Sequence, residues 1–125
     1  MRMPEPDLSV LARRQAIAGG LRGLLGDDGV IAGEDELRAY DCDGMSAYRQ
    51  LPMLVVLPRS TPEVVAVLKY CHAENVRIVP RGAGTGLSGG ALPLADAVTV
   101  GLGRMNRILD IDFANRAVVA QPGVT

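Results

Sequence analysis

Apolar and polar positions follow a helical period through the first part of the chain. Apolar residues recur every three or four positions over 9–25, which predicts an amphipathic helix with Asp7 or Ser9 as its N-cap. The residues of its expected inner face are Val10, Ile17, Leu21, Leu24 and Leu25. A short strand at 30–31 and a short polar helix at 34–40 follow, and residues 41–50 show no period and are expected to form a loop.

The pattern then changes to strand, helix and strand. Residues 53–57 are a continuous apolar run, typical of a buried strand. Ser60 and Glu63 have the spacing of a capping box, so a helix is expected over 62–75. Its expected inward stripe is Val64, Val65, Leu68 and Cys71. A strand at 77–79 completes a β-α-β unit, which predicts a parallel pair of strands.

Three further strands are expected at 97–102, 107–111 and 117–121. The polar run 112–116 has the composition of a hairpin turn between the last two. The pattern as a whole predicts an α+β fold, in which a small β-α-β sheet with helices on one side is followed by antiparallel strands.

The segment between the strands at 77–79 and 97–102 carries the strongest chemical signal. It reads PRGAGTGLSGGALP from Pro80 to Pro93. Glycine reaches backbone conformations closed to other residues, so successive N–H groups can point into one concavity that suits phosphate oxygens. Thr85 and Ser88 add hydroxyl donors, and Arg81 adds a positive charge. We interpret the segment as a phosphate or pyrophosphate loop; the alternative is a flexible glycine loop without a ligand.

Two common kinds of phosphate loop do not fit this segment. Gly84, Gly86 and Gly89 satisfy G-x-G-x-x-G, but the nicotinamide-type fingerprint requires a helix to begin inside the motif. Residues 90–93 are poor helical material, and a strand follows them. A nucleotide triphosphate loop requires Gly-Lys-Ser/Thr, which the segment lacks.

The same segment resembles the pyrophosphate loop of the FAD-binding domain of PCMH (vanillyl-alcohol oxidase) type. It is most similar to the catalytic D subunit of glycolate oxidase and to FAD-linked D-2-hydroxyacid dehydrogenases. The flanks at 57–65, 103–108 and 119–125 continue the resemblance. It implies an N-terminal helical lead-in at 1–50 and the N-terminal, truncated part of an FAD-binding domain at 51–125.

The resemblance implies noncovalent FAD and assigns its contacts by position. These contacts are Pro58, Arg81, Gly82, Ala83, Gly84, Thr85, Gly86, Ser88, Gly89, Pro122, Gly123 and Val124. Some members of the family bind FAD covalently through a histidine in this loop, and the matching position here is Thr85, which cannot form that bond. Pro58 also fits a plain strand stop, and Gly123 an ordinary turn.

The implied activity is oxidation of a 2-hydroxy acid such as glycolate or D-lactate, by hydride transfer to flavin N5. The family's substrate arginines, metal-ligating histidines and base lie in later segments, so the catalytic residues are unknown and no metal site is expected. FAD-binding and iron–sulfur companion subunits are implied partners. The alternative is a truncated, noncatalytic nucleotide- or FAD-binding module.

Composition restricts the partners and the compartment. The 13 basic and 14 acidic residues give a net charge of −1, which does not support binding of nucleic acid. Cys42 and Cys71 form no CxxC pair, and reduced thiols in a cytoplasmic protein are expected. Neither a secretory signal nor a transmembrane segment is expected.

Several polar residues are weaker candidates for chemistry. His72 is expected on the surface of its helix, and Asp110 and Asp112 are expected to be solvated or to cap the hairpin turn. Arg104 and Arg107 can neutralise phosphate, or pair with acids at a rim.

Overall fold

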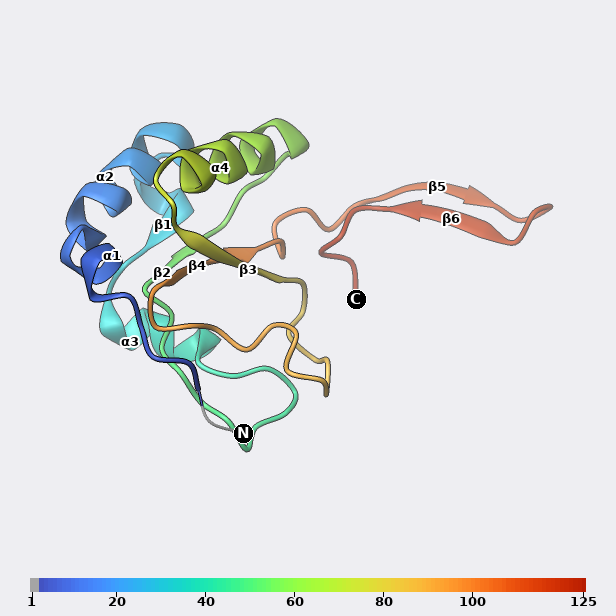
Figure 1. Cartoon of the computed structure of the whole chain (residues 1–125). Helices are drawn as coiled ribbons and strands as arrows, with labels where there is room; N and C mark the ends of the chain where they lie inside the picture. Colours follow the sequence, from blue (N-terminus) through green and yellow to red (C-terminus); the bar gives the residue numbers. More distant parts are fainter. Residues whose placement is uncertain (1–2) are drawn as a thin grey trace.

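The computed structural model describes residues 3–125, so the first two residues of the expected lead-in lie outside the described residues. Figure 1 shows helices packed on a small sheet and a two-stranded ribbon that projects from this body. The sheet has the order β1-β2-β4-β3. Its strands are β1 (Val30–Ile31), β2 (Leu54–Val56), β3 (Arg77–Arg81) and β4 (Ala97–Gly101).

β4 is the central strand of this sheet. It pairs in parallel with β2 on one side and with β3 on the other, and all residues of β2 and β4 are buried. The expected direct pairing of the strands at 53–57 and 77–79 is therefore wrong, although both run in the same direction. The reason is burial: β4 is buried on both faces, whereas β3 exposes Arg77, Ile78 and Pro80. Proline lacks an N–H donor and suits an edge strand.

The N-terminal helical segment consists of two helices, α1 (Leu8–Ala12) and α2 (Arg14–Leu25). The expected single helix is interrupted at Arg13. Asp7 is the N-cap, and its carboxylate accepts a hydrogen bond from the Ser9 N–H at 2.8 Å. The expected inner face is correct for Val10, Ile17 and Leu21, but Leu24 is 42% exposed.

The helix after β2, α4 (Thr61–Ala73), begins with a modified capping box. The Ser60 hydroxyl accepts a hydrogen bond from the Glu63 N–H at 3.4 Å. The Glu63 carboxylate reaches back one residue further than expected and accepts from the Arg59 N–H at 2.7 Å. The backbone N–H groups of Arg59 and Glu63 at the start of the helix are thus both bonded to side chains.

The buried face of α4 is rotated from the expected stripe. Val67 and Cys71 are buried, whereas Val65 and Leu68 are 43% and 39% exposed. The contact with α2 explains this orientation, because Tyr70 packs directly against Gly20, where a Cβ would overlap the tyrosine ring. Both cysteines are free thiols, as expected.

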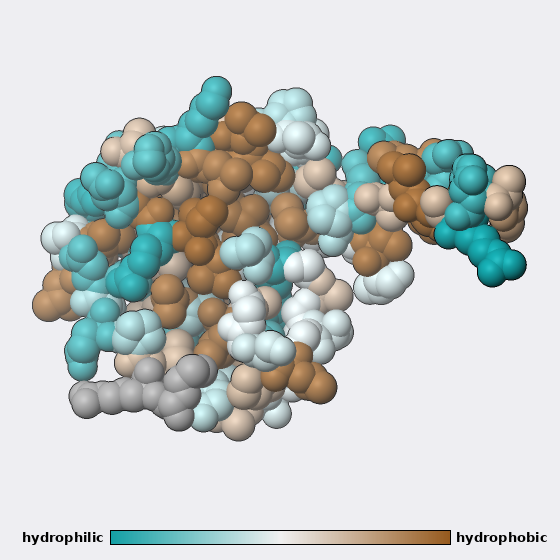
Figure 2. Space-filling view, turned by 45° about the vertical axis from the view of Figure 1, so that its right-hand side comes forward, coloured by the Kyte–Doolittle hydropathy of each residue, from teal (hydrophilic) through white to brown (hydrophobic). Residues whose placement is uncertain are grey.

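The remaining elements are short. They are η1 (Asp27–Gly29), α3 (Glu34–Leu37), η2 (Arg38–Tyr40), β5 (Ile108–Asp112) and β6 (Ala117–Ala120). β5 and β6 form the expected antiparallel hairpin, and Figure 2 shows hydrophobic side chains along the projecting ribbon. The Asp112 carboxylate accepts from the backbone and side-chain N–H groups of Asn115 at 2.9 and 2.6 Å, which lowers the pKa of Asp112.

One buried cluster joins the two parts of the chain. Val10, Ile17 and Leu21 from the N-terminal helices share it with Val56 and Val98 of the sheet. Within residues 3–125, no helix is both long and apolar enough to cross a bilayer. The expected domain boundary near residue 50 stays a prediction.

Asp96 connects the N-terminal segment to the start of β4. This carboxylate is 2% exposed, accepts a hydrogen bond from the Asp7 N–H at 2.7 Å and forms an ion pair with Arg77. A buried carboxylate needs such partners to offset its lost hydration.

Cys71 makes the stability of the fold sensitive to alkaline pH. Burial raises the pKa of its thiol from 9.0 to about 11. The folded state therefore keeps the proton when the unfolded state has lost it, so the stability from this group is complete below pH 9.0 and is lost toward pH 11. Urea titrations at increasing pH should show a loss of about 2–3 kcal/mol over this interval. Cys71→Val should remove most of the loss and Cys42→Ser should not; an equal alkaline loss in Cys71→Val would contradict this.

Removal of the Asp96 carboxylate should destabilise the chain. Asp96→Ala leaves the partly buried Asp7 N–H and the Arg77 guanidinium without their acceptor and opens space at a buried position, so the free energy of unfolding in urea should fall by about 2 kcal/mol. The matched control is Asp110→Ala on the exposed ribbon, which should change it by less than about 0.5 kcal/mol. Equal effects of the two substitutions would show that Asp96 does not hold the N-terminal segment.

Candidate functional site

The carboxyl ends of three parallel strands lie side by side at one edge of the sheet. Val56 of β2 pairs with Val100 of β4, and Arg81 of β3 pairs with Gly101 of β4. The segments that leave these strands therefore start next to one another, the arrangement in which parallel sheets commonly bind ligands. A pocket of about 340 Å³ lies there. Its lining residues are Ala39, Tyr40, Leu57, Arg81, Gly82, Ala83, Gly101, Gly103 and Arg104.

The glycine loop after β3 presents unpaired backbone donors at this edge. Within residues 3–125, the N–H groups of 82–88 donate no backbone–backbone hydrogen bond. Gly84 and Gly89 have φ angles of +74° and +75°, which disfavour any other residue at these two positions. A loop of free N–H groups with left-handed turns is the geometry of an anion-binding nest. The residues present thus fit a phosphate or pyrophosphate group.

The side chain of Arg81 lies against this loop. Its guanidinium donates a hydrogen bond to the carbonyl oxygen of Cys42 at 2.6 Å and lies 5.6 Å from the centre of the Tyr40 ring. A Cβ built on Gly84 would overlap the same guanidinium. The side chain is therefore enclosed between the loop and residues 40–42.

The C-terminal segment returns to the start of the glycine loop. A Cβ built on Gly82 would lie 3.5 Å from the carbonyl oxygen of Pro122. Gly123 donates a hydrogen bond to the Met105 carbonyl oxygen at 2.8 Å, and a Cβ at Gly123 would overlap the Leu102 carbonyl oxygen. Glycine at 123 is thus required by close backbone packing, and its expected contact with the flavin stays a prediction.

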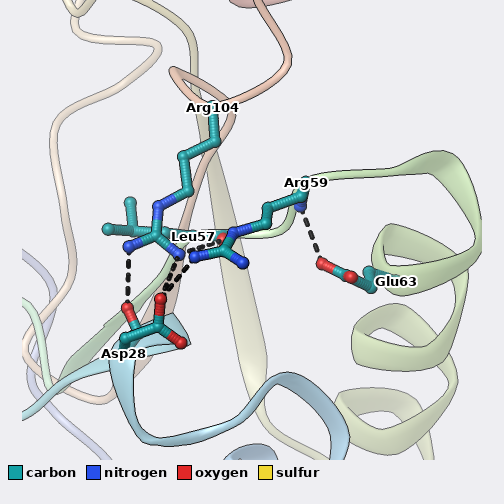
Figure 3. A network of polar contacts seen from close by, with 5 residues as sticks. All are labelled: Asp28, Leu57, Arg59, Glu63 and Arg104. Atoms are coloured by element: carbon teal, nitrogen blue, oxygen red, sulfur yellow. Dashed lines mark hydrogen bonds and ion pairs between the residues drawn. The ribbon is translucent and has the colours of Figure 1, made fainter.

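Two arginines share one carboxylate at the rim of the pocket (Figure 3). Arg104 donates to the Asp28 carbonyl oxygen at 2.9 Å, to the Asp28 carboxylate at 3.4 Å and to the Leu57 carbonyl oxygen at 3.5 Å. Arg59 forms an ion pair with the same carboxylate. The expected pairing of Arg104 with an acid is confirmed.

The other predicted contact residues lie at different depths. Pro58 is fully buried directly after β2 and is absent from the pocket lining. Thr85, Gly86 and Ser88 are exposed in the outer part of the loop. Gly89 and Val124 are half-buried. Arg81, Gly82 and Ala83 are the predicted residues that line the pocket itself.

Apart from Arg104, the weaker candidates do not join this site. His72 is exposed on α4, and Asp112 caps the ribbon turn. In residues 3–125, no group of three or more potential metal ligands occurs. Tyr40 and Cys42 are contacts that sequence reasoning missed, because an isolated tyrosine and a backbone carbonyl in an aperiodic loop leave no local pattern.

Comparison with known proteins agrees with this geometry. Residues 52–125 match the family model described as FAD binding domain. Glycolate oxidase subunit GlcD of Escherichia coli K12 is 50% identical over 95 residues, which cover 76% of this chain and 19% of that protein. The probable mitochondrial D-2-hydroxyglutarate dehydrogenase of Oryza sativa subsp. indica is 37% identical over 102 residues, which cover 82% of this chain and 18% of that protein.

A solved structure extends the likeness to the whole fold. The crystal structure of p-cresol methylhydroxylase with substrate bound has a TM-score of 0.79 and 27% sequence identity, and the match covers 98% of this chain and 24% of that one. The chain spans about a fifth of the length of the curated relatives it matches. The resemblance to a PCMH-type FAD-binding domain is confirmed, and FAD is the cofactor of the family. The chain belongs to the FAD binding domain family of flavin-dependent oxidoreductases.

Proposed function

We propose that residues 82–90 hold the pyrophosphate of noncovalent FAD in a flavoenzyme that oxidises a 2-hydroxy acid. The observation that carries the proposal is the run of unpaired N–H groups at 82–88, at the carboxyl ends of three parallel strands. Backbone donors fixed before the ligand arrives bind an anion without the cost of ordering side chains.

Positive charge and hydroxyl donors support the same role. Arg104 lines the pocket and the Arg81 guanidinium lies against the loop at Gly84. Both therefore place positive charge near the site where a negatively charged pyrophosphate would bind. Thr85 and Ser88 are exposed beside the free N–H groups and supply further donors. The residues at the carboxyl ends of β2, β3 and β4 can therefore bind and orient the cofactor.

Bound FAD would supply the redox chemistry, with flavin N5 as the hydride acceptor. A 2-hydroxy acid such as glycolate or D-lactate is proposed as substrate because the similar proteins include a glycolate oxidase subunit and a D-2-hydroxyglutarate dehydrogenase. GlcD is named as a subunit of glycolate oxidase, which supports the presence of companion proteins. We propose that these are an FAD-binding and an iron–sulfur subunit. We propose a cytoplasmic location for the complex.

The test is a titration of the purified chain with FAD, followed by flavin fluorescence. Gly84→Val and Gly86→Val should each weaken binding by at least about tenfold, because a β-branched side chain strains the loop at 84 and fills the concavity at 86. Gly23→Val is the matched control, since a Cβ there meets no atom within 4 Å and the position lies on α2. Equal affinity in all four proteins would contradict the proposed binding loop.

A second experiment tests the binding loop within a full-length flavoenzyme. In a chimera, residues 52–125 would replace the matching segment of E. coli GlcD, and the flavin that stays bound through gel filtration would be quantified. The transplant should retain flavin, and the same transplant with valine at 84 and 86 should lose it. Retention by the valine transplant would overturn the proposal.

A further inference from the structure

A contact between two loops far apart in sequence shapes the candidate site. Residues 40–44 lie outside the segment that matches the FAD binding domain family, which begins at residue 52. They nevertheless touch the glycine loop at two places, once through the Arg81 side chain and once through Gly44. Each contact restrains a different part of the loop.

The first contact uses the planar head of Arg81. One guanidinium nitrogen donates to the Cys42 carbonyl oxygen at 2.6 Å, and the guanidinium carbon lies 5.6 Å from the centre of the Tyr40 ring. Planar stacking over an aromatic face together with a directed hydrogen bond suits a guanidinium better than a lysine ammonium, which is a compact charge on a flexible stem. Gly84 lies against the same guanidinium, because a Cβ at this position would overlap it.

The second contact is between backbones. A Cβ built on Gly44 would lie 2.6 Å from the Thr85 carbonyl oxygen and 2.8 Å from that of Gly86. Only glycine therefore allows the segment at 40–44 to approach the outer part of the loop this closely. The neighbouring Asp43 side chain is buried, and its carboxylate accepts from the Met45 N–H at 2.9 Å, which fixes the turn at Gly44.

We propose that Arg81 is a positioning residue, which ties residues 40–44 to the glycine loop and sets the loop for a pyrophosphate before the cofactor binds. The inference rests on the proposed function for the role of the loop, but the contact itself exists without a ligand. It assigns the Arg81 head to Tyr40 and Cys42, in place of the direct FAD contact that the family resemblance implied.

The test measures loop order in the cofactor-free chain by ¹⁵N relaxation. Order parameters of residues 82–88 should be near 0.85 in the unaltered chain and in Tyr40→Phe, which keeps the ring. They should fall below about 0.6 in Arg81→Lys and Tyr40→Leu, while those of β4 stay unchanged. In the double variant Arg81→Lys/Tyr40→Leu, the order parameters of 82–88 should be no lower than in either single variant, since the two substitutions remove the same contact.

Two further variants control the experiment. Arg107→Lys makes the same substitution at an exposed arginine and should leave the loop unchanged. Gly44→Ala removes the backbone contact without altering Arg81 and should also lower the order parameters of 85–88. A loop already mobile in the unaltered chain, or one that stays ordered in Arg81→Lys, would overturn the proposal.

FAD affinity separates this inference from the proposed function. Under the proposal, Arg81→Lys loses most of the FAD affinity that Arg81→Gln loses, because the loop depends more on the position of the guanidinium than on its charge. If Arg81 instead met a phosphate directly, Arg81→Lys would keep most of the affinity and the loop would stay ordered, which would contradict the proposal. An ordered loop that depends on Arg81 in a chain without FAD affinity would sustain the inference and refute the proposed function.

Discussion

The parallel pairing of β4 with both β2 and β3 is the constraint on which the site depends. This pairing aligns three carboxyl ends, so the segments after Val56, Arg81 and Gly101 leave the sheet at one edge. The pocket is formed by these segments, and any change of strand order would separate its walls. Burial favours this order, because every residue of β4 is buried and a largely apolar strand of this kind suits the centre of a parallel sheet.

The strands bring the glycine loop to this edge, and side-chain contacts then give it a shape. A loop rich in glycine has a high conformational entropy in isolation, so its order must come from neighbouring groups. Arg81 and Gly44 supply two such contacts, and the carbonyl oxygen of Pro122 approaches the loop at Gly82. Arg104, which also lines the pocket, is held by the carboxylate and the carbonyl oxygen of Asp28.

The sequence predicted the features that depend on neighbouring residues. The apolar runs became β2 and β4, the spacing of Ser60 and Glu63 marked the start of α4, and the glycine loop was found between two strands. The features that depend on distant residues were missed. The insertion of β4 between β2 and β3, and the rotation of α4 toward Val67, follow from packing partners that no local period reveals. The same holds for the contact of Arg81 with Tyr40 and Cys42.

The most direct measurement is a map of backbone amide chemical shifts in the ¹⁵N-labelled chain during titration with FAD and, separately, with inorganic pyrophosphate. Both ligands should shift the amides of 82–88 most, and FAD should add shifts near Leu57 and Arg104. The opposite end of the sheet provides the internal comparison, because a second pocket there is lined by Pro52, Met53 and Ala95. Shifts at that end, or none at 82–88, would contradict a cofactor site at the carboxyl ends of the strands.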